Sequence, residues 1–191
     1  MTRTFYALTF SAALALGACN NQTATADNNM AADDLNPMTN VRTADMNAAN
    51  TGGAIDSAFL TEAMKGDNSE VALGKIAQTK GSTQGVKDLG TMLVNDHGAH
   101  KQQVAALAQQ AGVAVTDDVM DEAKTLMTKL NGLSGSAFDK AFVDAAVEDH
   151  QKDIAKYEAQ AKSGDPQTAA LANQTLPTLR KHLDTAQSLQ K

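Results

Sequence analysis

Apolar residues recur at alternating intervals of four and three from about position 54 onward, which is the spacing of helices with one buried face. The stretch from 82 to 111 shows the pattern most plainly. Its expected buried positions are Val86, Gly90, Leu93, His97, His100, Val104, Leu107 and Ala111. No segment alternates with a period of two, and Val and Ile are sparse. The pattern therefore predicts helices and no strands.

Glycine, proline and helix-capping residues divide this region into five predicted helices. They cover roughly residues 56–80, 82–111, 116–131, 134–162 and 165–191. Four of them are long, and one short helix lies between the second and the fourth. Long amphipathic helices with short connections favour an antiparallel four-helix bundle, here with one extra short helix. Residues 54–191 are enough for one domain with its own core.

The N-terminal region differs in composition from the helical region. Residues 1–18 combine one basic residue, Arg3, with an apolar run too short to span a bilayer, which is typical of a signal peptide. The run ends in Leu16-Gly17-Ala18-Cys19, which is similar to the lipobox of bacterial lipoproteins. Cys19 is the only cysteine, so we expect it to carry the lipid and no disulfide to form. Residues 19–53 contain almost no branched apolar side chains and predict a disordered linker.

These features predict an exported protein that contacts the membrane through its N-terminal lipid. Asn20 follows the cysteine where an aspartate would retain a lipoprotein at the inner membrane. For a Gram-negative source, this favours the outer membrane, facing the periplasm. The whole chain carries 16 basic and 22 acidic residues, a formal charge of −6, with no basic patch for nucleic acid. The sequence does not specify a protein partner.

Candidate chemistry is concentrated in the histidines. All four, His97, His100, His150 and His182, fall on predicted buried faces, as does Glu70. In a bundle, side chains at matching heights of facing helices meet in the core. We therefore expect Glu70, His97, His150 and His182 to be able to hold one transition metal ion of the Fe, Mn, Zn or Cu class.

The outer partners of that site would be Asp96, His100 and Asp149. The alternative is a structural network in which the buried histidines and Glu70 satisfy one another and no metal binds. The sequence lacks the paired Glu-x-x-His motifs of di-iron bundles.

Motifs for other chemistry are absent from the sequence. It contains no glycine-rich phosphate loop, no Gly-x-Ser-x-Gly elbow and no cysteine outside the lipobox. Trp is absent, and few aromatic residues are available to stack on bases or sugars. We therefore predict no catalytic residues and a non-enzymatic role.

Several short motifs, in this order, resemble the exported bacterial domain-of-unknown-function family 4142. They are residues 70–75 (EVALGK), 92–97 (MLVNDH), 135–139 (GSAFD), 147–150 (VEDH) and 176–183 (LPTLRKHL). The resemblance covers about residues 56–187 and implies a ferritin-like helical bundle with no established activity. Its motif positions correspond to Glu70, Asp96, His97, His150, Leu176, Pro177 and His182, and not to His100.

Two hypotheses follow. The first is a lipid-anchored envelope protein that binds partners or takes part in a stress response without catalysis. The second is a ferritin-like bundle that stores, senses or oxidises a transition metal.

Overall fold

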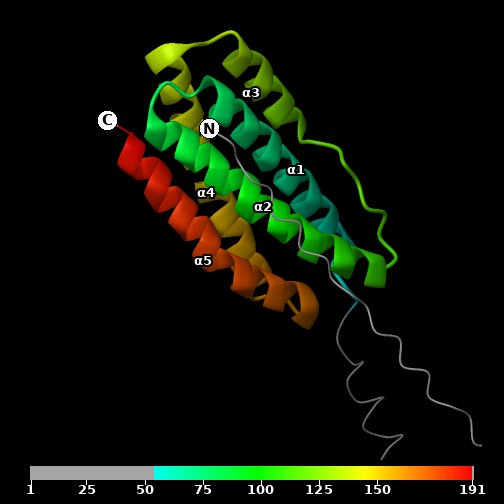
Figure 1. Ribbon diagram of the computed structural model, residues 1–191. Coiled ribbons are helices and arrows are strands. Elements are labelled where there is room, and N and C mark those ends of the chain that lie inside the picture. Colours follow the sequence, from blue (N-terminus) through cyan, green and yellow to red (C-terminus); the bar gives the residue numbers. More distant parts are fainter. Residues whose placement is uncertain (1–53, 191) are drawn as a thin grey trace, which may run out of the picture. The chain divides into compact units, whose positions relative to one another are not determined.

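The computed structural model describes residues 54–190, and this part of the chain contains five helices and no strand (Figure 1). The helices are α1 (Ser57–Lys80), α2 (Gln84–Gln110), α3 (Asp121–Asn131), α4 (Gly135–Gln160) and α5 (Pro166–Leu189). The all-helical prediction is confirmed. The predicted signal peptide, the linker and Cys19 lie outside the described residues. No described helix is long and apolar enough to cross a membrane.

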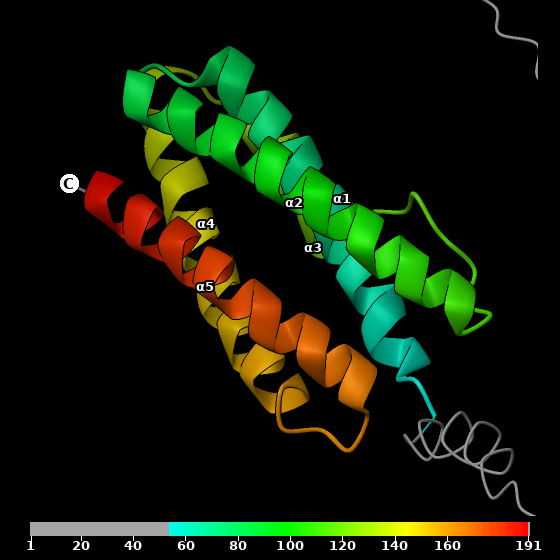
Figure 2. The same ribbon diagram turned by 60° about the horizontal axis from the view of Figure 1, so that its bottom comes forward.

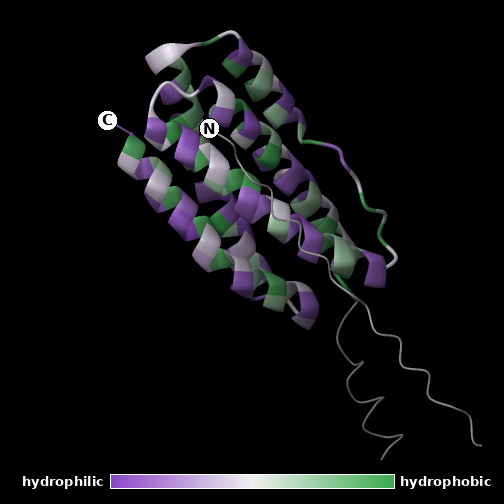
Figure 3. Cartoon of the chain, viewed as in Figure 1, coloured by the Kyte–Doolittle hydropathy of each residue, from purple (hydrophilic) through white to green (hydrophobic). Residues whose placement is uncertain are grey.

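The four long helices form an antiparallel bundle. α1 packs mainly on α2, and α4 packs mainly on α5; Figure 2 shows these two pairs side by side. The pairs meet where α2 contacts α5 and where α1 contacts α4. α3 lies outside this square and contacts α1 and α4 (Figure 1). Hydrophilic and hydrophobic residues are interspersed along each helix (Figure 3), as expected for helices with one buried face.

One carboxylate connects the starts of two helices. Asp139, near the start of α4, accepts hydrogen bonds from the backbone N–H groups of Ser82 (2.8 Å) and Thr83 (3.0 Å). Thr83 is the N-cap of α2, and its side chain accepts from the Val86 N–H. The starts of α2 and α4 therefore lie at the same end of the bundle. These two helices run parallel because the connection containing α3 returns the chain to that end.

The third helix is shorter than predicted, because it begins at Asp121 and not near residue 116. The preceding segment is held in a non-helical conformation by α1. The amide of Asn68 donates to the carbonyl groups of Thr116 and Asp118. The Ser69 hydroxyl accepts from the Met120 N–H. These bonds to another helix occupy backbone groups that an additional helical turn would need.

α1 and α2 approach each other closely at Gly74 and Gly90. A Cβ atom built on Gly90 would lie 2.7 Å from the Gly74 carbonyl oxygen and 2.9 Å from the Ala77 Cβ. A Cβ on Gly74 would lie 2.7 Å from the Gly90 carbonyl oxygen. The two helices can therefore make this contact only with glycine at both positions.

The core consists of apolar clusters on either side of a polar layer. One cluster, at the end where α2 and α4 begin, contains Leu73, Leu93, Phe138, Phe142 and Ala186, among others. Clusters toward the other end contain Leu60, Met64, Val104, Tyr157, Leu176 and Leu179. In each long helix, buried acids or histidines lie between the residues of the first apolar cluster and the residues of the clusters at the other end. These residues are Asp67, Glu70, His97, His100, His150 and His182. The layer therefore lies inside the bundle, closed by apolar packing above and below.

Candidate metal centre

Three histidines from three helices converge in the polar layer. His97 comes from α2, His150 from α4 and His182 from α5. Each offers one ring nitrogen, and these three atoms all lie within 4.8 Å of one another. The exposed fractions of the three residues are only 5%, 1% and 1%, respectively. Among the described residues, they form the group of three metal-binding side chains whose ligand atoms are close enough to share one ion.

Each ring is oriented by a hydrogen bond on its outward side. The outward nitrogen of His97 is Nδ1, which lies 3.0 Å from Asp67 Oδ1. That of His150 is also Nδ1, 2.9 Å from the carbonyl oxygen of Ala146. That of His182 is Nε2, 2.9 Å from Asp96 Oδ2.

All three outward partners are acceptors, so each fixes the single proton of a neutral imidazole on the outward nitrogen.

The inward nitrogens are then bare lone pairs that face one another. His150 Nε2 lies 3.1 Å from His182 Nδ1. His97 Nε2 is buried and has no hydrogen-bond partner. Neutral rings can make the contact between His150 and His182 favourable only if one of them turns its proton inward. The outward nitrogen of that ring would then point a lone pair at another acceptor, the Ala146 carbonyl oxygen or the Asp96 carboxylate, and the two would repel each other. Neutral imidazoles therefore cannot satisfy every contact at once.

Protonation does not resolve this conflict at neutral pH. Burial, and the electrostatic effect of the neighbouring imidazoles of His97 and His182, lower the pKa of His150 to about 3. Burial also lowers the pKa of His182, although the hydrogen bond to Asp96 opposes this. Both rings therefore stay neutral near pH 7, which is the form that binds metals.

Asp67 is the site residue that the sequence interpretation missed. Its carboxylate accepts from His97 Nδ1 and, at 2.9 Å, from His100 Nδ1. Burial by itself raises the pKa of Asp67, but hydrogen bonds from His100 and His97 outweigh it and hold the pKa below its ordinary value. Asp67 is therefore an ionised buried group whose charge is balanced by two ring N–H donors.

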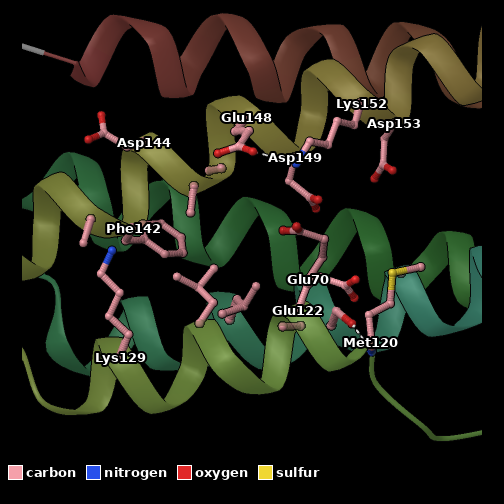
Figure 4. A pocket seen from close by; sticks show the side chains of 18 of the residues that line it. Glu70, Met120, Glu122, Lys129, Phe142, Asp144, Glu148, Asp149, Lys152 and Asp153 are labelled. Atoms are coloured by element: carbon pink, nitrogen blue, oxygen red, sulfur yellow. Dashed lines mark hydrogen bonds and ion pairs between the residues drawn. The ribbon is translucent and has the colours of Figure 1, made fainter.

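The other predicted site residues occupy different places. Asp96 contacts His182 from outside, which is the role expected of an outer partner. His100 is held by Asp67, and its own Nε2 is buried without a partner. Glu70 is not part of the group of three histidines. It contacts Asp149 in a cavity between α1, α3 and α4 (Figure 4). Whether a metal binds at any of these residues stays a prediction.

Fold and sequence together define a class and then a family. The described residues form an antiparallel four-helix bundle with a buried polar layer. The chain belongs to the family described as "Domain of unknown function (DUF4142)", whose pattern matches residues 41–189. The resemblance inferred from the motifs is confirmed, and the family carries no assigned activity.

A solved structure is similar in fold. It is the "Crystal structure of DUF305 fragment from Deinococcus radiodurans", with a TM-score of 0.62 and 15% sequence identity. The alignment covers 70% of this chain and 93% of that one. At this identity the likeness concerns the fold alone. No curated protein matches the chain.

Proposed function

We propose that this bundle binds a divalent transition metal ion of the zinc or copper class. The ligand atoms would be His97 Nε2, His150 Nε2 and His182 Nδ1. The observation that carries the proposal is the convergence of three lone pairs whose rings are all fixed from outside. Metal-binding histidines usually donate their other N–H to a carboxylate or a backbone carbonyl, and all three rings do so here.

The geometry suits such an ion once the three ring nitrogens move slightly closer together. Zinc binds imidazole nitrogen at about 2.0–2.1 Å, so two nitrogens of a tetrahedral site lie about 3.3 Å apart. The distance of 3.1 Å between the His150 and His182 nitrogens is close to this value. His97 would move inward from its place within the 4.8 Å group. Imidazole ligands favour zinc and copper over magnesium and calcium, which prefer oxygen.

A metal titration tests the proposal. The full chain, purified without a histidine tag, should bind close to one Zn²⁺ or Cu²⁺ per molecule by calorimetry and by elemental analysis after gel filtration. His150→Gln removes one inward lone pair and should lower the affinity at least tenfold. His100→Gln is the matched control, because His100 Nε2 is outside the group of three nitrogens. Circular dichroism checks that both variants are folded. Equal binding by His150→Gln and the unmodified chain would reject the site.

We further propose that the bundle works at the membrane surface of the cell envelope, attached through a lipid on Cys19. Support comes from the lipobox-like residues 16–19 and from the absence of another cysteine in the sequence. Two or more acyl chains give stable attachment where one does not. Expressed in a bacterium, the chain should fractionate with membranes, and Cys19→Ser should shift it to the soluble fraction. Unchanged membrane attachment of the variant would contradict the anchor.

A further inference from the structure

A cavity of about 440 Å³, whose lining contains no histidine, lies between α1, α3 and α4. Six carboxylates and three lysines line it, so its walls are acidic. Figure 4 shows the side chains of Glu70, on α1, and Asp149, on α4, pointing toward each other in this cavity. Asp153 lies one helical turn further along α4. Three of the six carboxylates, Glu70, Asp149 and Asp153, therefore lie at the same end of the cavity.

Glu70 is unusual among them because it is buried without a donor. Only 3% of its surface is exposed. Among the hydrogen bonds of residues 54–190, no N–H group and no hydroxyl donates to its side chain. Its side chain contacts the Asp149 carboxylate. Burial raises the pKa of Glu70 well above its ordinary value, and the interaction with Asp149 raises it further. Two acceptor groups in contact repel each other unless a proton or a cation lies between them.

The lysines of the cavity do not supply that positive charge. Lys152 is paired with Glu148 at 2.6 Å, and Lys156 is paired with Glu62. Lys129 lies at the opposite end of the cavity, away from Glu70 (Figure 4). The contact between Glu70 and Asp149 is thus left without a cationic partner from the protein among these residues.

We propose that Glu70 and Asp149 bind a hard divalent cation, such as Mn²⁺, Mg²⁺ or Ca²⁺, at a site separate from the three histidines. Carboxylate oxygens are the ligands that such ions prefer, and one or two carboxylates with several retained waters are sufficient. Asp149 is exposed and Glu70 is buried, so the ion would enter from the α4 side and keep water on its open face. Asp153, which is half-buried nearby, would add negative charge.

Mn²⁺ is the probe that tests this site, because the electron paramagnetic resonance signal of the free ion disappears on binding. The full chain should bind one Mn²⁺ with a dissociation constant below about 1 mM. Glu70→Gln should weaken binding at least tenfold and fold normally, since the new amide can donate to Asp149. Asp149→Asn, at an exposed position, should have the same effect. Mn²⁺ should raise the melting temperature of the unmodified chain and not that of either variant.

Two control variants distinguish this site from nearby carboxylates and from the histidines. Glu148→Gln changes a carboxylate of the same helix and cavity that is already paired with Lys152, and it should bind Mn²⁺ as the unmodified chain does. His150→Gln removes a ligand of the proposed histidine site and should also leave Mn²⁺ binding unchanged. These variants therefore test the carboxylate site independently of the histidine site. Absence of Mn²⁺ binding, unaltered binding by Glu70→Gln and Asp149→Asn, or loss of binding in His150→Gln alone would overturn the proposal.

Discussion

Replacing Asp67 by Asn is expected to lower the free energy of unfolding by about 3–5 kcal/mol, because it disrupts a buried charged group held by two histidines. An amide has one acceptor oxygen, and its NH₂ group cannot accept from a ring N–H. His97 Nδ1 lies 3.0 Å from Asp67 Oδ1, and His100 Nδ1 lies within 3.0 Å of both carboxylate oxygens, so in either orientation the new NH₂ group would face at least one ring N–H. Chemical denaturation followed by circular dichroism measures the change.

The same variant also probes the proposed histidine site. Without Asp67, His97 loses the bond that directs its Nε2 inward, so zinc affinity should fall about 10–100-fold. Asp88→Asn is the control, because Asp88 is an exposed carboxylate of α2 whose contact is the Gln84 side chain. It should change stability by less than about 0.5 kcal/mol and leave zinc affinity unaltered. An Asp67→Asn protein as stable as the control would contradict the buried pairing.

Gly90→Ala is expected to cost about 3 kcal/mol of unfolding free energy, although alanine is the better helix former. Its new methyl group would lie 2.7 Å from the backbone oxygen of Gly74, so α1 and α2 would have to separate. Gly98→Ala gives the matched comparison in the same helix, because beyond the local backbone of α2 no atom lies within 4 Å of a Cβ there. That change should raise stability by about 0.5–1 kcal/mol. Thermal unfolding of both proteins should show shifts of opposite sign; shifts of the same sign would argue against the close approach.

The arrangement of the helices could be predicted from the sequence because the spacing of the apolar residues agrees with the positions of the glycine, proline and capping residues at the helix ends. The apolar positions of α2 and the stop at Gly81 are read directly from residue types. The start of α3 could not be predicted, since it depends on Asn68 and Ser69 binding a distant backbone segment. Local patterns near residue 116 contain no information about those two side chains.

The candidate site was predicted in part for a similar reason. Buried-face spacing placed the histidines in the core, and three of them meet there. Asp67 went unnoticed because an aspartate beside a predicted buried face is usually a solvated residue. One available signal was its distance from Glu70, three residues along α1, which places both acids on one face. The pairing of Glu70 with Asp149, and not with the histidines, depends on side-chain directions between α1 and α4 that the spacing cannot resolve.

The division of the bundle into two helical hairpins has a consequence for how long the folded state lasts. α1 and α2 form one hairpin, joined closely at Gly74 and Gly90, and α4 and α5 form the other. His97 belongs to the first, whereas His150 and His182 belong to the second. A metal ion held by all three would be a reversible cross-link between two units that form by mostly local contacts. Because it would bind only while the two hairpins are docked, it would both raise the equilibrium stability and slow their separation, so the loaded protein should resist proteases for longer.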